Sequence, residues 1–412
     1  TLSALARELP GLVVHEVPSG TSAFDWTVPN EWNIYGARVT GPGGEKVIDF
    51  SDSNLHVVSY SEPVHTTIDK SALDQHIHSD PEIPESIPYV TSYYHPSWGI
   101  CMADRDRQRL SDGPYRVDID SRLEPGSLSY GELLIPGETS AEVLLSTYIC
   151  HPSMGNNELS GPVVQTAVAQ WLGTMPRRFT YRLVFIPESI GSLLYTSLHL
   201  RSLQENVVAG INLTCLGDEG DYSFLASRQG NTPMDRIGRR VVRETDQPVE
   251  YTYLDRASDE RTYAAPGIDL PLISLMRTMY GRYRGYHSSL DDLTFITETG
   301  LQGGFDLVRN CLVQFEKSRY FLTTVRGEPQ LGRRGLYHTM HARTVSDEVL
   351  LRTHILAYSD GMHSTIDIAE MTGNDIQLIE ALVDELYDHG LLVETAPRRS
   401  DIPDGFINRK DS

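Results

Sequence analysis

Near-continuous apolar runs alternate with segments of helical spacing through the middle of the chain, and this pattern constrains the fold more than any other feature. The apolar runs cover residues 143–150, 181–186, 207–216 and 270–276, and the helix-spaced segments cover residues 162–172, 192–203 and 301–320. Strands that are apolar on both faces, with helices between them, are typical of a mostly parallel sheet covered on both sides. The sequence therefore predicts an α/β domain.

The composition argues against some classes of function. The chain of 412 residues has 56 acidic and 35 basic side chains and a formal net charge of −21. This balance argues against general binding to nucleic acid or to an anionic membrane, because phosphate would be repelled. The four cysteines show no paired spacing, so we expect reduced thiols. No apolar run reaches membrane-spanning length, and we expect a cytoplasmic protein.

A region of short strand-like runs precedes the alternation of strands and helices. After a helical fragment and a strand-like run at the N-terminus, residues 33–132 contain short strand-like runs separated by Pro, Gly, Asp and Ser. The runs at residues 46–50, 55–60 and 115–120 are the clearest. We predict a small all-β domain over 33–132, inserted into a main domain that consists of 1–32 and 133–330.

The C-terminal part, residues 337–412, indicates a winged helix. Helices are predicted at residues 346–358, 365–371 and 374–389, and a wing strand at 391–394. The third helix has five acidic side chains and no Lys or Arg, so it would repel phosphate. We therefore expect a role in protein contact or dimerisation. A DNA-binding regulator is the less favoured alternative.

Polar residues cluster at the predicted strand ends. They are His151, Asn157 and Glu158 after the first strand, Glu188 after the second, Asp218 after the third, and Asp259, Glu260, Arg261 and His287 further on. Because the carboxyl ends of parallel strands share one edge of the sheet, these side chains can converge. Imidazoles and carboxylates are zinc ligands, and a free carboxylate such as Glu188 can act as general base. The pattern predicts metal-assisted amide hydrolysis.

Structural roles are also open to these residues. His151 can bond a backbone carbonyl, Glu188 can cap the following helix, and Asp218 can be a turn residue. Asp291 and Asp292 are interpreted as cap or supporting groups. Ser160 is interpreted as a packing residue, because no base is evident beside it.

Five ordered motifs carry a resemblance to a known family. They lie at residues 151–162, 185–191, 258–261, 286–293 and 328–336. The chain resembles a bacterial family of aminopeptidase-like proteins of unassigned function, over essentially its whole length. The resemblance implies a zinc-exopeptidase-like α/β/α sandwich, a β domain inserted near the N-terminus and a C-terminal winged helix. That family begins with a longer helix, so we expect a short leading segment to be missing here.

The resemblance also implies residue roles, through the related di-zinc aminopeptidases. His151 and His287 match zinc ligands, and Glu188 matches the general base. Asn157 stands at the place of the metal-bridging Asp, whereas Ser189 and Thr214 replace ligating carboxylates. A neutral amide is a weak bridge between two zinc ions. We therefore expect one zinc ion, held by His151 and His287 with a carboxylate from Asp259, Asp218 or Glu158.

The expected function is that of a mono-zinc, aminopeptidase-like hydrolase acting on a small peptide or an aminoacyl conjugate. Asn157 and Glu158 are predicted to contact the substrate, Glu260 to bind its ammonium group, and Arg261 its carboxylate. The alternative is a non-catalytic scaffold or binding protein that keeps the exopeptidase fold. Self-association through the winged helix or the β domain is open, and no nucleic-acid or membrane partner is expected.

Overall fold

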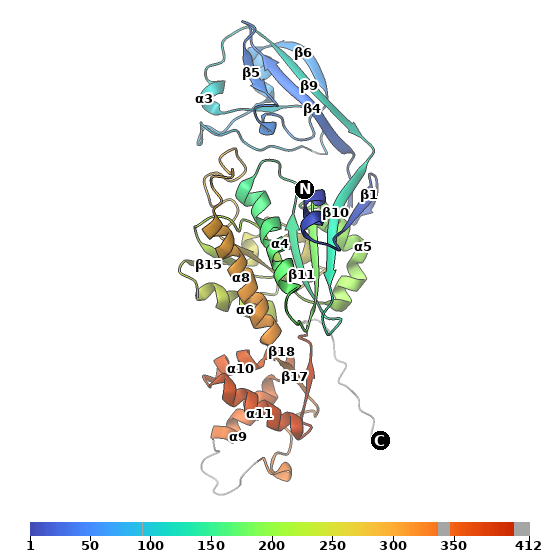
Figure 1. Ribbon diagram of the computed structural model, residues 1–412, viewed down its shortest axis with the longest axis vertical. Helices are drawn as coiled ribbons and strands as arrows, with labels where there is room; N and C mark the ends of the chain where they lie inside the picture. The colour runs from blue at the N-terminus through green and yellow to red at the C-terminus, as the bar shows by residue number, and fades with distance from the viewer. Residues whose placement is uncertain (93, 337–346, 399–412) are drawn as a thin grey trace.

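The computed structural model describes residues 1–92, 94–336 and 347–398. Three parts follow one another along its long axis: the inserted β domain, the α/β domain and the C-terminal domain (Figure 1). This is the predicted architecture, an α/β fold with an inserted β domain and a C-terminal winged helix.

The central sheet has eight strands in the order β1-β10-β12-β11-β13-β16-β14-β15. Their bounds are β1 Val13–Pro18, β10 Ser127–Ile135, β11 Glu142–Tyr148, β12 Thr180–Ile186, β13 Val207–Leu213, β14 Tyr222–Leu225, β15 Pro248–Tyr251 and β16 Leu272–Met276. The middle strands β12, β11, β13 and β16 are parallel, and β1, β10 and β14 are antiparallel to their inner neighbours. The apolar runs in the sequence correspond to this parallel middle.

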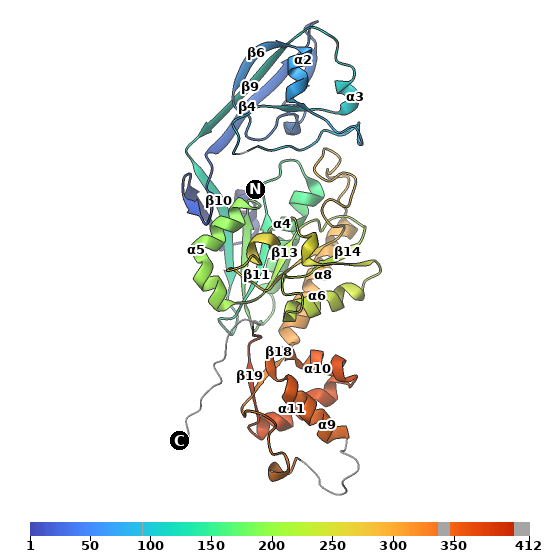
Figure 2. The ribbon, with the colours of Figure 1, turned by 180° about the vertical axis from the view of Figure 1, so that it is seen from behind.

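Helices cover both faces of the sheet. α4 (Ser160–Leu172), α6 (Pro233–Arg243) and α8 (Glu298–Lys317) lie on one face (Figure 1), and α5 (Ile190–Asn206) and α7 (Glu260–Tyr263) lie on the other (Figure 2). Side chains of one strand alternate between the two cores: Leu183 and Phe185 of β12 face one, and Val184 and Ile186 the other. Because both faces are buried, β12 is apolar at nearly every position. The helix α1 (Leu2–Glu8) also packs on the first face.

The inserted domain is built on a four-stranded antiparallel sheet in the order β5-β4-β9-β6. Its elements are β4 Glu31–Thr40, β5 Lys46–Asp49, β6 Val64–Asp69, α2 Lys70–Leu73, β7 Ile77–His78, β8 Ile100–Cys101, α3 Asp104–Arg107 and β9 Pro114–Glu124. The short strands β2 Ser22–Ala23 and β3 Trp26–Thr27 precede them, and Ala23 packs in the core of the α/β domain beside α5. The strand predicted at 55–60 is wrong, because the Ser53 hydroxyl accepts the N–H of Leu55 and starts a 3₁₀ turn. β10 follows β9 and belongs to the central sheet, so the predicted boundary at residue 133 falls inside a strand.

Within residues 319–336 and 347–398, the C-terminal domain has three α-helices and a three-stranded sheet in the order β18-β17-β19. Its elements are β17 Tyr320–Thr323, α9 Asp347–Tyr358, β18 Asp360–Ser364, α10 Thr365–Thr372, α11 Ile376–Asp388 and β19 Leu392–Thr395. The helix predicted to reach residue 320 ends at Lys317, and Tyr320 begins β17 instead, because its backbone pairs with β18 and β19. This sheet therefore starts before the predicted boundary. Ser346, the first residue of the helix predicted at 346–358 and a candidate for its N-cap, lies outside the described residues.

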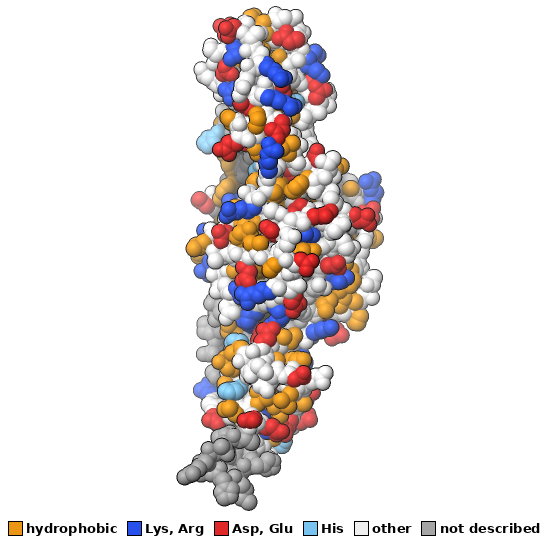
Figure 3. Space-filling model, turned by 90° about the vertical axis from the view of Figure 1, so that its left-hand side faces the viewer, with side chains coloured by type: hydrophobic (Ala, Val, Ile, Leu, Met, Phe, Trp, Pro, Cys, Tyr) orange, Lys and Arg blue, Asp and Glu red, His pale blue; other side chains and the backbone are white. Residues whose placement is uncertain are grey.

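The structure shows how the charged side chains are distributed on the surface and where the cysteines lie. Acidic and basic side chains are interspersed along the face seen in Figure 3. All four cysteines are unpaired, and Cys101, Cys215 and Cys311 are buried. Within the described part of the chain, no helix has the length and apolar character needed to cross a membrane.

Candidate metal centre

His151 lies just beyond the carboxyl end of β11, and its imidazole is held by carboxylates on both sides. It is buried, with 7% of its surface exposed. Glu158 Oε2 accepts the backbone N–H of His151 at 2.8 Å and lies 3.4 Å from Nδ1, whereas Nε2 lies 3.5 Å from Glu188 Oε2. A histidine whose Nδ1 is bonded to a carboxylate, with Nε2 directed into the site, has the arrangement common to metal ligands. Glu158 therefore orients His151.

His287 comes from the loop between β16 and α8, and its ring faces His151. The two ring centres are 5.1 Å apart, and His287 Nε2 is buried without a hydrogen-bond partner among the described residues. Since zinc–nitrogen bonds are about 2 Å long, two imidazoles on one tetrahedral zinc ion have ring centres roughly 5 Å apart. The pair therefore fits a zinc ion.

The two histidines have opposite electrostatic surroundings. Burial, together with the charge of His151, lowers the pKa of His287 to about 4, so this ring is neutral near pH 7. Burial acts in the same direction on His151, but Cys150, Glu158 and Glu188 outweigh it and raise the pKa of His151 well above its usual value. In the metal-free protein the proton therefore resides on His151, where a metal ion would compete with it.

Glu188 occupies the turn between β12 and α5. Its Oε1 accepts a hydrogen bond from Ser258 Oγ at 2.7 Å, which leaves Oε2 directed to His151. The carboxylate thus faces His151 instead of capping α5. The next residue, Ser189, has a backbone φ of +63°, which is uncommon outside glycine, and its N–H donates to Asp259 Oδ1 at 2.8 Å.

Asp259 and Arg261 flank this turn at different depths. Asp259 is fully buried, and its Oδ2 has no hydrogen-bond partner in the described part of the chain. Burial and the nearby charge of Glu188 raise the pKa of Asp259 to about 7. Arg261 is exposed, and its guanidinium donates to Ser189 Oγ at 2.5 Å and to the Ser258 carbonyl at 3.1 Å. Asp259 is thus a buried carboxyl group with one oxygen left without a partner among the described residues, and Arg261 is a cation at the protein surface.

Two predicted site residues are fully engaged by the protein. Asp218 accepts four hydrogen bonds, from the backbone N–H groups of Gly220 and Thr278, the Thr278 hydroxyl and the Asn156 amide. Glu260 accepts five, from the N–H groups of Ala257 and Ser258, the hydroxyls of Ser274 and Tyr280, and the Asn212 amide. With their oxygens occupied, these carboxylates serve the fold, and we place neither in the metal centre.

Asn157 and Thr214, which stand at positions of metal-ligating carboxylates in the resemblance, meet at the hydroxyl of Tyr148. Asn157 Nδ2 donates to that hydroxyl at 2.6 Å, and Thr214 Oγ1 lies 2.5 Å from it. The Tyr148 ring also contacts His151, with ring centres 5.2 Å apart. A neutral, hydrogen-bonded triad therefore occupies the space beside the histidines.

The loop before α4 is a π-helical turn, Gly155–Leu159, and a residue far along the chain caps its N–H groups. Asp291 accepts the N–H groups of Asn156 and Asn157 at 2.6 and 2.9 Å, as expected for a cap or supporting group. Ser160 donates to the Asn156 carbonyl and accepts the N–H of Leu216, so its hydroxyl is structural, as predicted.

Sequence reasoning missed two residues of the centre. Cys150 Sγ lies 3.5 Å from His151 Nδ1, and Cys150, His151 and Glu158 offer three ligand atoms within 4.8 Å of one another. Its position next to His151 at a strand end was the available signal. Tyr89 comes from the inserted domain, and its ring meets both His151 and His287 edge-on. No local motif marks Tyr89, because its partners lie far along the chain.

Comparisons with known proteins place the chain in a family. Residues 1–318 match a domain of unknown function (DUF4910), and residues 319–394 match a winged helix-turn-helix. A Clostridium acetobutylicum protein described as "Putative polysaccharide biosynthesis protein with aminopeptidase-like domain" is 40% identical over 398 residues, which cover 95% of this chain and 90% of the relative.

Solved structures of other proteins have folds similar to that of this chain. A crystal structure of a "putative peptidase" from Clostridium acetobutylicum has a TM-score of 0.79 at 39% identity, and the match covers 96% of this chain and 90% of that one. A zinc aminopeptidase from Bacillus subtilis has a TM-score of 0.55 at 11% identity, covering 76% and 86%. At that identity the second similarity shows the fold alone. The chain therefore belongs to the DUF4910 family of aminopeptidase-like proteins, joined here to a winged helix-turn-helix domain.

Proposed function

We propose that this protein is a metal-dependent amide hydrolase that uses one zinc ion and acts on a small peptide or an aminoacyl conjugate. One observation carries the proposal: the imidazole of His287, whose Nε2 is buried and unpartnered among the described residues, faces the buried imidazole of His151, and the Glu188 carboxylate lies 3.5 Å from His151. Two imidazoles and a non-ligating carboxylate are the groups that hydrolysis at a zinc site needs.

The proposal of one ion rests on the residues beside the pair. A second zinc ion would need an anionic bridge, and Asn157 instead directs an amide N–H to the Tyr148 hydroxyl. Ser189 Oγ is bonded to Arg261, and Thr214 Oγ1 to Tyr148. The unpartnered Oδ2 of Asp259 makes this buried carboxyl our candidate for a third ligand.

The chain's own groups would handle the proton and the substrate. Bound zinc supplies Lewis acidity toward a carbonyl oxygen and lowers the pKa of a water molecule. Glu188, oriented by Ser258 Oγ at 2.7 Å, would accept a proton from water and deliver it to the leaving amine. The exposed guanidinium of Arg261 is suited to a carboxylate on the substrate.

The relative from Clostridium acetobutylicum guides the choice of substrate. Its description names polysaccharide biosynthesis. We therefore propose that aminoacylated sugars be tested first among the aminoacyl conjugates, followed by dipeptides. The expected setting is the cytoplasm, without nucleic acid or membrane as partner.

Metal content and activity test the proposal together. Protein purified without chelator should carry about one zinc ion per chain by elemental analysis. The double change His151→Ala and His287→Ala should remove that ion. Glu188→Gln should keep the zinc and reduce turnover of any accepted amide by at least ~100-fold, which is within the range of general-base catalysis.

A non-catalytic scaffold is the second candidate, and the neutral triad around Tyr148 is the observation that favours it. If the wild-type protein takes up no zinc even when zinc is added, the hydrolase proposal fails and the scaffold takes its place.

A further inference from the structure

A short segment of the inserted domain, residues Ser86–Tyr89, runs along the loop that carries His287; we call it the strap. It pairs with that histidine and with the two residues that follow it, Ser288 and Ser289. The Tyr89 N–H donates to the His287 carbonyl at 2.8 Å, and the Ser289 N–H donates to the Ile87 carbonyl at 2.8 Å. The Ile87 N–H donates to Ser289 Oγ at 2.9 Å, and Pro88 and Ser288 form an antiparallel bridge.

The strap braces a backbone conformation that needs support. His287 has a φ of +53°, in the left-handed region that residues with a side chain seldom occupy. Such a conformation costs on the order of 1 kcal/mol or more and persists only when its surroundings hold it. The hydrogen bonds from the strap act on His287 itself and on Ser289, so they provide that support from another domain.

Tyr89 adds a contact between the two imidazoles. Its ring centre lies 5.2 Å from that of His151 and 5.4 Å from that of His287, with interplanar angles of 62° and 81°. Tyr286 stacks on His287 at 3.9 Å, and Tyr148 contacts His151 at 5.2 Å. Tyr89 thus contacts both histidines at once, and edge-to-face contacts of this kind have a preferred geometry.

We propose that the inserted β domain is part of the metal centre: the strap fixes His287, and Tyr89 is a positioning residue that holds the two imidazoles at the separation one zinc ion requires. This inference rests on the proposed function, because it assumes that the histidines bind metal. It gives the insertion a role that a lid over the site would not have. A residue of the inserted domain thus completes a site whose other residues belong to the α/β domain.

The proposal predicts a loss of metal affinity without loss of the fold. Tyr89→Ala should weaken zinc binding at least ~10-fold, measured by competition with a chromophoric chelator, because the imidazoles are no longer pre-organised. It should also change the visible spectrum of the cobalt-substituted protein. Tyr89→Phe keeps the ring and should retain wild-type affinity and spectrum. Tyr35→Ala, at an exposed tyrosine of β4 in the same domain, is the matched control.

A second measurement needs no metal. In the metal-free protein, His287 of the Tyr89→Ala variant should react faster with diethyl pyrocarbonate, followed by peptide mass spectrometry, because its ring loses cover. Tyr89→Leu serves in the same tests if the alanine variant does not fold. Zinc affinity, cobalt spectrum and His287 reactivity all equal to wild type would overturn the proposal. Absence of zinc from the wild type would instead contradict the proposed function, while the reactivity test would still decide whether the Tyr89 ring packs on His287.

Discussion

The buried carboxyl groups of this site differ in how many hydrogen bonds they accept. That number determines which of them has an oxygen left to bind a ligand. Glu260 and Asp218 are surrounded by donors, so their oxygens are committed to the fold. Asp259 has donors on one oxygen only. Of two neighbouring carboxyl groups, Glu260 therefore serves the structure, whereas Asp259 keeps one oxygen without a hydrogen-bond partner among the described residues.

The raised pKa of Asp259 predicts a pH-dependent stability. The pKa rises from 3.8 to about 7 on folding, so between these values the native protein holds a proton that the unfolded chain has lost. Stability of the metal-free protein should therefore fall as the pH rises through this range, by up to about 1.4 kcal/mol per pH unit. Asp259→Asn should flatten that slope in urea unfolding, whereas Asp255→Asn, at an exposed carboxyl, should leave it unchanged. An identical slope in the Asp259 variant would contradict the assignment.

Single elements are positioned by contacts from far along the chain. The π-helical turn that carries Asn157 and Glu158 is capped by Asp291, which is 134 residues from Asn157. Asp291 also accepts the Tyr283 hydroxyl at 2.8 Å. The Asp291 carboxylate thus connects the turn that carries Glu158 to the loop that carries His287.

Removing that carboxylate should loosen the turn. Asp291→Ala leaves three donors without an acceptor, so we expect the free energy of unfolding to fall by on the order of 3 kcal/mol. Chemical denaturation monitored by circular dichroism measures this. The neighbouring Asp292 is exposed and bonds only locally, to Thr294, so Asp292→Ala should cost less than about 1 kcal/mol. Equal effects of the two changes would argue against the capping role.

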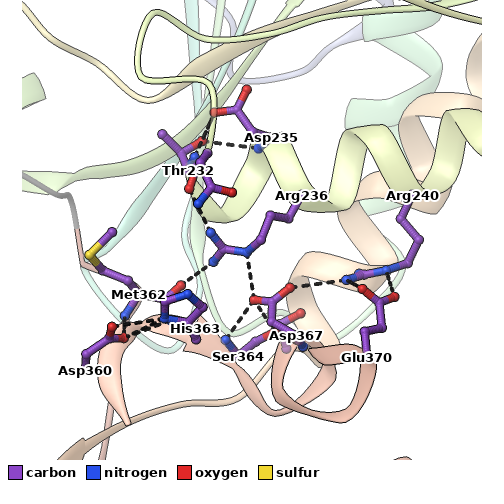
Figure 4. A network of polar contacts seen from close by, with 12 residues as sticks. Thr232, Asp235, Arg236, Arg240, Asp360, Met362, His363, Ser364, Asp367 and Glu370 are labelled. Atoms are coloured by element: carbon purple, nitrogen blue, oxygen red, sulfur yellow. Dashed lines mark hydrogen bonds and ion pairs between the residues drawn. The ribbon is translucent and has the colours of Figure 1, made fainter. Parts of the chain in front are cut away.

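At the scale of the whole molecule, an ionic network around the buried Asp367 connects the C-terminal domain to α6 (Figure 4). Arg236 and Arg240 of α6 lie 3.1 and 3.2 Å from the two oxygens of Asp367, which is 4% exposed. Arg236 also donates to the Met362 carbonyl, and Arg240 to Glu370. Asp367 in turn caps α10 with Ser364. The start of α10 is therefore shared between the two domains.

Breaking this network should uncouple the domains. The double change Arg236→Ala and Arg240→Ala leaves Asp367 buried without its cations, which typically costs about 3–5 kcal/mol. We expect calorimetry to show a separate, lower transition for the C-terminal domain. Arg243→Ala is the control on the same helix, because Arg243 is exposed and pairs with Glu250 in its own domain. A single unshifted transition in the double variant would contradict the coupling.

The third helix of the winged-helix domain, α11, carries the acidic face that the sequence predicted. Arg319 pairs with Glu380 and Asp384, and Arg352 pairs with Glu385, so cations of this chain already meet part of that charge. Phosphate would still face exposed acidic groups such as Asp388. We expect no binding to duplex DNA in fluorescence anisotropy at low salt, where electrostatic attraction is strongest. Binding there would restore the regulator hypothesis.

The sequence by itself determined the parallel strands of the central sheet, their covering helices and the placement of His151 and Glu188 at strand ends. Burial on both faces makes such strands apolar at nearly every position, and that signal is local. Only the tertiary structure decided which carboxylates are engaged, that β17 pairs with the C-terminal strands, and that Tyr89 lies against both histidines. These outcomes depend on contacts between residues far apart along the chain, and no local pattern records such partners.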